Sequence, residues 1–531
     1  MFVCCFLLAH LAFAVVNPTG KTWSEGELQT GIDGDSWTNL TPGNTPVIAQ
    51  YGYQPIGTAD PSNPNLVHNF NQVLTNAYQG FFAAGGHYEY PHNELPAVSY
   101  YAAEYGPADN YGTGLDAGIA FHENGTTLFL SGRGGAYNGS GGLGDNGGET
   151  DSIIELNIPT LIKPSDPNDR TGVQTATAAQ PWSSVFRHTL TENYGFHSIN
   201  GLFYDDVTDK LCVQGIVEYD SFPYTQDNML CYRDPSDLST STVDGFYQVK
   251  PASGAQIAGT EAAHAATWMA DVPSAWQAAL GGRVLWGGGK NGSILSRSTV
   301  GPSLFAGTLN GLGTNGVLNV TRHMDFWDID GLQMGAAFFP DRVTNGTSWY
   351  QYEMMNCDRD QSSYNCAADG TDSAQVVPWI NDFYNIMSYS HLGFIIPGTD
   401  TYAVIGQIEG GEDGISYKGT PPYLNGGSFG GSNECPGPCR VQYEDIHNKY
   451  WLFDLNDITN AVNSWDIFPY EHGNITFLDE FETVTGARSI MRNATFDLAT
   501  GRLAVVMSGR SGDPEYSEVD IVIFQDAGWV E

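Results

Sequence analysis

Three histidines open apolar segments in well-separated parts of this chain, and their side chains are suited to catalysis. They are His197 in FHSINGL, His264 in AAHAATW and His391 in SHLGFII, in a chain with only 12 histidines. An imidazole titrates near neutral pH, so it can act as a general base or as a metal ligand. Tyr219 in VEYDSF adds a phenolic hydroxyl that could donate a proton. These four are the candidate catalytic residues.

Basic side chains are scarce, yet several lie in Gly-rich turns or at the start of an apolar segment. Such cations can neutralise a carboxylate or a sulfate on a substrate. The candidates for substrate binding are Arg133 in SGRGGAY, Lys290 in GGGKNGS, Arg492 in SIMRNATF and Arg510 in SGRSGDPEY. Joined to a base and an acid, they would support β-elimination on a uronic-acid glycan. The plainer alternative is that the histidines satisfy backbone groups and the arginines cap neighbouring turns.

A repeated phrase indicates how these distant residues could meet. It occurs at 117–132, 200–215, 392–406 and 493–509, each time as a short apolar strand, a polar turn and a second apolar strand that ends in Gly. Alternating apolar positions around a tight turn are typical of a β-hairpin. Hairpins that recur through a chain favour four-stranded propeller blades. We therefore expect an all-β fold, a single-ring β-propeller with six or seven four-stranded blades, seven being preferred.

The blades can be placed approximately along the chain. They are expected near 116–158, 197–234, 263–300, 331–356, 390–455 and 489–525, with a weaker one near 46–103. Residues 15–107 are rich in loops and should supply a strand that closes the ring. A short helix is expected around Ser274–Leu280. In a propeller the first strand of each blade starts on the face to which the second-to-third-strand loop returns, so the candidate residues should converge at one mouth of the central channel.

Composition and charge narrow the classes of function. The chain has 531 residues, 41% of them hydrophobic, with 64 Gly and 27 Pro, which suits a turn-rich β protein with a large core. Its net charge of −39 repels nucleic acid and anionic membranes. The charge is explained by solubility, or alternatively by calcium binding to some carboxylates, although no segment matches an EF-hand loop. No other cofactor is indicated.

The first residues have the pattern of a secretory signal. FVCCFLLAHLAFA is apolar, and Ala12, Phe13 and Ala14 form an A-x-A cleavage site. We expect residues 1–14 to be removed and residues 15–531 to form a single propeller domain. No later segment approaches the roughly 20 apolar residues of a membrane span. The mature protein is therefore expected to be secreted and extracellular.

The cysteines agree with an oxidising compartment. Six remain after the signal, and closeness in sequence favours three local disulfides over the other connectivities. These pairs are Cys212–Cys231, Cys357–Cys366 and Cys435–Cys439. The last pair resembles a zinc half-site, but no second cysteine pair stands near it.

Eight N-x-S/T sequons make glycosylation plausible in a eukaryotic secretory pathway. Several lie in turns that the repeat predicts to be exposed. They are Asn39, Asn124, Asn138, Asn291, Asn319, Asn345, Asn474 and Asn493.

One stretch resembles a known group of proteins. WQAALGGRVLWGGGKNGSILSRSTVGPSLFA, at 276–306, is similar to secreted propeller-like proteins in which W-Q-x-x-L-G-G precedes I/L-S-R-x-S/T-x-G-P. GLFYDDVTDKL and KYWLFDLNDI look like matching blades of that group. The resemblance covers patches of residues 195–524. It implies the propeller fold and brings no catalytic residues with it.

Three functions remain open at this stage. The first is a secreted carbohydrate-active enzyme, a lyase or hydrolase of an acidic polysaccharide, which the 28 Tyr and 12 Trp would suit. The second is a non-catalytic propeller that binds glycans or proteins in an extracellular matrix. The third is a metal-dependent oxidoreductase built on the three histidines. The chain contains no G-x-S-x-G elbow, H-E-x-x-H, P-loop or Rossmann fingerprint, and the sequence leaves the oligomeric state open.

Overall fold

A computed structural model describes most strands of the protein and the turns between them. The described residues are 63–84, 118–123, 125–135, 149–183, 198–216, 228–251, 264–288, 302–313, 315–325, 388–409, 446–461, 464, 467, 469–482, 488–507 and 519–531, together with the short strands β1 (Val15–Val16) and β2 (Thr22–Trp23).

Within these residues, β3 to β22 make up five groups of four antiparallel strands, which we call blades. Blades 1, 4 and 5 are separate sheets, whereas blades 2 and 3 join into one eight-stranded sheet through a parallel pairing of their outermost strands. Blade 1 contains β4 (Ile119–Phe121), β5 (Thr127–Gly135), β6 (Glu149–Asn157) and β7 (Thr177–Ser183). Blade 2 contains β8 (Ser198–Asp205), β9 (Lys210–Ile216), β10 (Met229–Arg233) and β11 (Val243–Pro251), and blade 3 contains β12 (Trp268–Asp271), β13 (Val284–Gly287), β14 (Leu304–Gly307) and β15 (Asn315–Met324). Blade 4 contains β16 (Tyr389–Ile395), β17 (Thr401–Glu409), β18 (Ile446–Asp454) and β19 (Glu471–Asn474), and blade 5 contains β20 (Met491–Asp497), β21 (Arg502–Met507), β22 (Asp520–Gln525) and β3 (Tyr78–Ala83).

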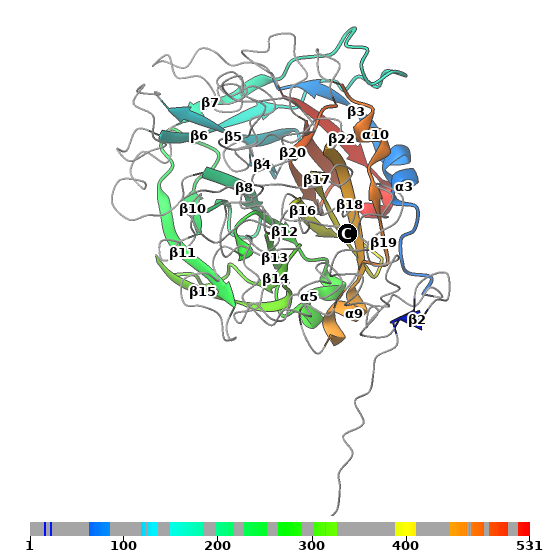
Figure 1. Ribbon diagram of the computed structural model, residues 1–531. Helices are drawn as coiled ribbons and strands as arrows, with labels where there is room; N and C mark the ends of the chain where they lie inside the picture. The colour runs from blue at the N-terminus through cyan, green and yellow to red at the C-terminus, as the bar shows by residue number, and fades with distance from the viewer. Residues whose placement is uncertain are drawn as a thin grey trace, which may run out of the picture.

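The first strand of each blade is the innermost, and the five inner strands close into a ring. β4 contacts β8, and contacts continue through β12, β16 and β20 back to β4. Figure 1 shows these strands nearest the middle of the molecule. The N-terminal strand β3 pairs with β22 near the C-terminus and completes blade 5. The all-β propeller class is therefore confirmed, as is the expectation that the N-terminal region supplies a closing strand.

Among the described residues, five inner strands contact one another in a ring, whereas the expected number of six or seven blades stays a prediction, because long segments such as residues 326–387 lie outside the described part. Of the weak blade near 46–103, the structure describes only α3 (Phe70–Ala77) and β3, and β3 belongs to blade 5. Residues 331–356 lie outside the described part, and β12 contacts β16 directly without a blade between them. The repeated phrase marks only the first hairpin of a blade. The two outer strands follow long connections of variable length, so hairpin spacing does not measure blade spacing.

Small residues let the inner strands approach very closely. A Cβ on Gly201 of β8 would lie 2.4 Å from the carbonyl oxygen of Thr267, in blade 3. A Cβ on Gly118, before β4, would lie 2.8 Å from Leu202. Across the ring, Asn493 Nδ2 of β20 donates a 2.6 Å hydrogen bond to the carbonyl oxygen of Asn200. The middle of the ring is therefore packed with protein atoms.

Hydrophobic packing continues outward between neighbouring blades. The largest core cluster joins α3 with blades 3, 4 and 5, and it includes the fully buried rings of Trp268, Trp451 and Phe70. Helices are few and short: α5 (Ser274–Leu280), α9 (Leu455–Asn460), α10 (Thr476–Asp479) and the 3-10 turn η4 (Ala527–Trp529) join α3 in the described part. The helix expected at Ser274–Leu280 is confirmed.

One of the three predicted disulfides lies in the described part and is present. Cys212 of β9 and Cys231 of β10 stand directly opposite each other and form a buried disulfide within blade 2. The other predicted pairs, Cys357–Cys366 and Cys435–Cys439, lie outside the described residues.

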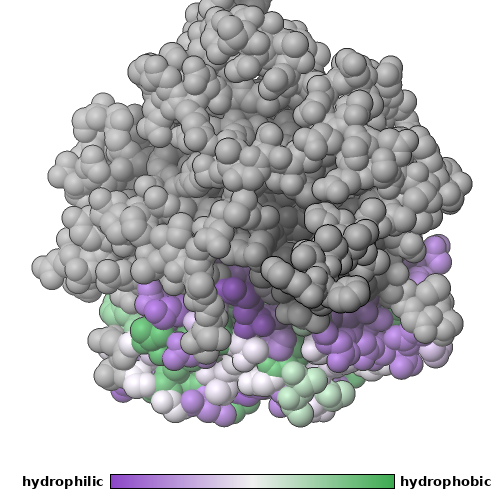
Figure 2. All heavy atoms as spheres, turned by 60° about the horizontal axis from the view of Figure 1, so that its bottom comes forward, coloured by the Kyte–Doolittle hydropathy of each residue, from purple (hydrophilic) through white to green (hydrophobic). Residues whose placement is uncertain are grey.

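The described surface is polar with scattered apolar side chains. On the face turned forward in Figure 2, hydrophilic and hydrophobic residues are interspersed. Large exposed hydrophobic side chains in the described part are Val207, Val317 and Val530. No helix among the described residues is long and apolar enough to cross a membrane.

The close approach at Gly201 can be tested by adding one methyl group. Because backbone atoms of blade 3 occupy the space, Gly201→Ala should lower the free energy of unfolding by about 1–3 kcal/mol. Gly473→Ala in β19 is the control, since its Cβ would lie 3.3 Å from the hydroxyl end of the Tyr450 side chain. Chemical denaturation of both variants measures the difference. Equal stability of the two variants would contradict the packed centre.

A carboxylate-lined cavity at the turn end of the ring

The predicted catalytic histidines that the structure describes are buried. His264 lies just before β12 and is fully buried, with its Nδ1 3.0 Å from both carboxylate oxygens of Asp325. His391 in β16 is 2% exposed, and its ring lies parallel to that of Tyr389. Arg492 in β20 is 7% exposed. All three are therefore enclosed by protein, as the plainer alternative expects.

These residues share one end of the ring, which we call the start end because the inner strands begin there. In three blades the pairing of the first strand with the second is shifted by one extra residue, a β-bulge. These residues are Asn200, His391 and Arg492, and they occupy the same place in β8, β16 and β20. A bulge at such a place re-aims a side chain. Ser303 Oγ, just before β14 in the same blade, donates a 2.6 Å hydrogen bond to the carbonyl oxygen of His264. A catalytic role for this end stays a prediction.

The other predicted site residues give no geometry. His197, Tyr219, Lys290 and Arg510 lie outside the described residues. Arg133 lies in β5, and its side chain is outside the described part.

Three predicted glycosylation sites lie in described segments, and one of them is wrong. Asn493 is 1% exposed and its amide nitrogen is bound to Asn200, so it has no room for a glycan in the folded protein. Asn319 is exposed on β15, and Asn474 is half-buried with its Nδ2 3.1 Å from His447 Nδ1. The remaining sequons, Asn39, Asn124, Asn138, Asn291 and Asn345, lie outside the described residues.

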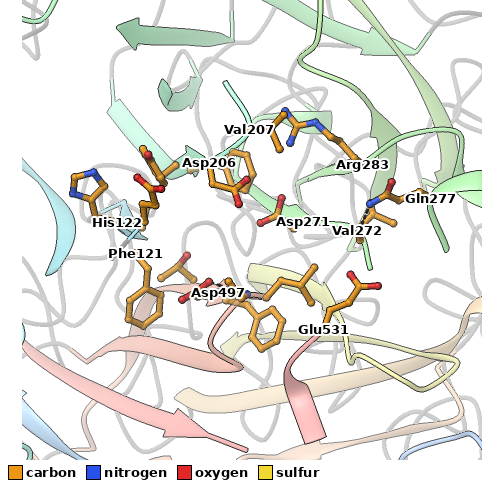
Figure 3. Close-up of a pocket in the computed structure, with 18 residues that line it drawn as sticks. Phe121, His122, Asp206, Val207, Asp271, Val272, Gln277, Arg283, Asp497 and Glu531 are labelled. Atoms are coloured by element: carbon orange, nitrogen blue, oxygen red, sulfur yellow. Dashed lines mark hydrogen bonds between the residues drawn. The ribbon is translucent and has the colours of Figure 1, made fainter. Parts of the chain in front are cut away.

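A cavity of about 310 Å³ opens at the opposite end, which we call the turn end because the inner strands finish there in their first hairpin turns. Figure 3 shows its walls, which come from the ends of β4, β8, β12 and β20, from α5 and from the C-terminal residue of the chain. Five carboxyl side chains line it: Glu123, Asp206, Asp271, Asp497 and Glu531. The aromatic lining comes from Phe121, Phe203, Tyr204 and Phe496.

Asp271, the last residue of β12, holds its proton at neutral pH. It keeps some solvent contact through the cavity, but protein surrounds it on nearly every side. Burial raises the pKa of this carboxyl to about 8, with the charges of Asp206, Asp205 and Asp497 adding to the rise and Arg283 opposing it. Within the described part of the chain its carboxyl accepts and donates no hydrogen bond. It is thus a carboxylic acid that can give up a proton inside a cavity.

Two aspartates at equivalent places in the repeat differ in one respect. Asp205 ends β8 and Asp497 ends β20, and each carboxylate accepts hydrogen bonds from the turn that follows it. Val207 N and Thr208 Oγ1 donate to Asp205. Ala499 N and Thr500 Oγ1 donate to Asp497. Asp205 is fully buried and also binds the Arg283 guanidinium at 2.5 Å.

Asp497 has no cation partner among the described residues, and it faces the cavity half-buried. Its turn therefore fixes the direction of its carboxylate without neutralising its charge. Asp205, in contrast, is a structural carboxylate with its counter-ion in place.

His122, at the end of β4, is a second titratable group held in place at this end. Its Nδ1 lies 2.7 Å from Glu155 Oε1, and Glu155 also accepts hydrogen bonds from Thr127 Oγ1 and Gln180 Nε2. Burial raises the pKa of Glu155, but these hydrogen bonds outweigh it and leave that pKa below its ordinary value. The ionised Glu155 fixes the His122 ring, which meets the Tyr204 ring edge-on at 4.8 Å.

Tyr204 stands beside a group of exposed carboxylates. Its hydroxyl donates a 3.0 Å hydrogen bond to Asp209. Burial raises the pKa of this phenol, and the charges of Asp209, Glu123 and Asp206 raise it further. Glu123 and Asp206 are exposed, and neither has an ion-pair partner in the described part. The cavity is therefore negatively charged on this side.

The basic side chains of the lining already have carboxylate partners. Arg283 is bound to Asp205 and His122 to Glu155, and no further basic side chain among the described residues lines the cavity. No group of three or more His, Cys, Asp and Glu side chains in the described residues has the arrangement of a metal site. The carboxyl groups of the lining, of which Asp271 holds a proton, can transfer protons to and from a bound molecule.

The sequence contained a signal for this site that was not used. Three of the four copies of the repeated phrase end their first strand in HEN, DDV or DLA, and β12 ends likewise in ADV, so acidic residues recur where four of the inner strands finish. His122 lines the cavity and is held by a buried carboxylate, although its sequence context does not single it out. Charge alone could not single out these acids among 60.

No protein-family model and no curated protein matches the chain. Several solved structures follow a similar course. One is a glycosyl hydrolase from Bacteroides ovatus, with a TM-score of 0.34 and 8% identity over 85% of this chain and 95% of that chain.

A second structure comes from work on the GH130 family of mannoside phosphorylases, which contains glycoside hydrolases that target β-1,2 mannosidic linkages in Candida mannan. That structure has a TM-score of 0.37 and 8% identity, over 87% of this chain and 96% of that chain. A third is a levansucrase mutant from B. megaterium, with a TM-score of 0.30 and 9% identity over 90% and 96%. The chemistry of the cavity rests on this chain's own residues.

The state of Asp271 can be measured through the stability of the fold. Its folded pKa of about 8 lies above its ordinary value, so between the two the folded state holds a proton that the unfolded chain has lost. The free energy of unfolding should therefore fall as the pH rises, by up to about 1.4 kcal/mol per pH unit from this group. Asp271→Asn removes this dependence, so its stability relative to wild type should grow between about pH 5 and about pH 8. Urea unfolding at both pH values measures it, and a constant difference would show that the carboxyl titrates normally.

Proposed function

We propose that the protein hydrolyses glycosidic bonds in the cavity at the turn end of the ring. The observation that carries this is the presence of a protonated carboxyl, Asp271, and a second carboxyl group held in place by its own turn, Asp497, on different walls of one cavity. A pair of carboxyl groups, one of which carries a proton to donate, is what the cleavage of a glycosidic bond requires.

Each carboxyl group has a role that follows from its surroundings. Asp271 would give its proton to the oxygen that leaves when the bond between C1 and that oxygen breaks. Asp497 would either attack C1 or take a proton from the water that does so, and the configuration of the product distinguishes these two routes. The hydrogen bonds from the Asp497 turn hold its carboxylate in one direction, which such a role needs.

The rest of the lining suits a sugar ring. Phe121, Phe496 and Tyr204 offer flat apolar surfaces beside polar groups, the usual composition of a small-molecule site. The rim residue Val207 is 63% exposed and extends the apolar surface outward.

Hydrolysis is favoured over β-elimination at this cavity. Elimination on a uronic acid needs a cation that is available to the substrate carboxylate, and Arg283 is held by Asp205. An acidic polysaccharide as substrate stays a prediction that depends on Arg492 and the other basic residues assigned to the start end. We also propose an extracellular location, which the Cys212–Cys231 disulfide supports because such bonds persist in oxidising compartments.

The test combines a substrate screen with two variants. Wild-type protein is assayed on neutral oligosaccharides and on nitrophenyl glycosides, with reducing ends and nitrophenolate as readouts. Asp271→Asn should lower kcat on oligosaccharides about 100-fold or more, because no acid then protonates the leaving oxygen. Its activity on nitrophenyl glycosides should be largely retained, since nitrophenolate leaves without a proton. Asp497→Asn should lose activity on both, and wild-type kcat on oligosaccharides should fall above about pH 8, where Asp271 ionises.

The control is Glu480→Gln, which removes one exposed charge away from the cavity. It should retain wild-type activity. Full activity of Asp271→Asn on oligosaccharides would overturn the assignment of the acid. Binding of oligosaccharides without any cleavage by wild-type protein would favour the non-catalytic propeller instead.

A further inference from the structure

We propose that the glycan bound in this cavity carries a free amine, so that the substrate class is an oligosaccharide of amino sugars with protonated amino groups. This rests on the proposed function for the cleavage step but not for binding. The ammonium would sit between Glu123 and Asp206, beside Tyr204.

The first support is the distribution of charge in the lining. The basic side chains that line the cavity in the described part, Arg283 and His122, are bound to carboxylates that lie behind the wall. Glu123 and Asp206 have no such partner in the described part of the chain, although both line the cavity. A positively charged ligand would form ion pairs with these two carboxylates, whereas a ligand with a carboxylate or sulfate would be repelled by them.

The second support is that the cavity is a formed site and not only a patch of acids. It has a volume of about 310 Å³ and aromatic walls. The Asp271 carboxyl keeps some solvent contact, has no hydrogen-bond partner among the described residues and is drawn in Figure 3 at the cavity. A ligand that forms a hydrogen bond with this carboxyl would replace that solvent. The sugar oxygen next to the amine-bearing ring is a suitable partner.

The position of the amine follows from the chemistry of Asp271. A positive charge next to that carboxyl would lower its pKa and release the proton that cleavage needs. The amine must therefore lie away from Asp271, on the side where Glu123, Asp206 and Tyr204 gather. The net charge of −39 would also draw a polycationic glycan toward the protein at low ionic strength.

Binding can be measured without turnover. The probes are pairs of tetrasaccharides in the gluco and galacto configurations, each pair identical except that the amines are free or N-acetylated. The protein is the full-length Asp271→Asn variant at about pH 6, where wild-type Asp271 is protonated and Asn therefore preserves the charge of the cavity. Isothermal titration calorimetry gives the two dissociation constants of each pair.

We expect at least one free-amine tetrasaccharide to bind about 5-fold or more tightly than its N-acetylated counterpart. This preference should shrink between about 50 mM and about 500 mM salt. Adding Glu123→Gln and Asp206→Asn should reduce it to within about 2-fold while leaving the N-acetylated affinity unchanged. Adding Glu480→Gln and Glu482→Gln instead, which removes the same charge from exposed sites elsewhere, should leave the preference intact.

Equal affinities within every pair, tighter binding of the N-acetylated forms, or no binding of any probe would overturn the inference. The inference would also be overturned if Glu480→Gln and Glu482→Gln abolished the amine preference as fully as Glu123→Gln and Asp206→Asn do. The preference would then arise from the charge of the whole protein surface and not from the cavity. Cleavage of neutral glycans by wild-type protein without any charge preference would leave the proposed function standing alone. A clear amine preference without cleavage by wild-type protein would leave only the binding inference.

Discussion

The tight closure of the five inner strands is the constraint on which the rest of the structure depends. Five strands leave little space at the middle of a ring, and this chain meets that limit with Gly118 and Gly201, where a Cβ would strike the next blade. The Asn493–Asn200 hydrogen bond then joins opposite blades across the centre. The described inner strands thus pack closely in the middle of the ring, and the residues that differ most between the blades lie at its two ends.

The ends do differ in how they treat charge. At the start end, His264 faces Asp325 inside the protein, and ionisable groups are enclosed with their partners. At the turn end, carboxylates outnumber cations, and the cations are turned toward buried acids. Keeping Asp271 in such surroundings works against stability at high pH, which is the usual cost of a group placed for function and not for folding. The extensive blade cores offset it.

The sequence could predict the elements of the fold better than their number. The hairpins at 200–215 and 493–509 are evident because apolar alternation brackets an Asp-rich turn, and the helix at Ser274–Leu280 follows from its composition. Blade number was not predictable in the same way, because β7, β11, β15 and β19 have no repeated phrase and follow connections of different lengths.

The cavity at the turn end was not predicted from the sequence for a related reason. His264 and His391 stand out because histidine is rare here, whereas Asp271 is one of many acids and looks like a turn residue. Its protonation depends on burial and on Asp206, Asp205 and Asp497, which come from two other blades. The pKa of Asp271 is therefore set by residues that are far apart in the sequence and close together in the fold. No local sequence pattern could predict it. The equivalence of Asp205 and Asp497 was visible in the sequence, but the partner that neutralises only Asp205 was not.

The pairing of β3 with β22 has a consequence for how the chain folds. Gln79 donates a hydrogen bond to the carbonyl oxygen of Gln525 across 446 positions, so the last blade cannot be completed until nearly the whole chain has been made. Contacts of such long range form slowly, because loop closure must precede them. Until β3 arrives, β22 presents an unpaired apolar edge, the kind of edge that recruits strands from other molecules. Assembly of this ring is therefore most exposed to aggregation at its final step.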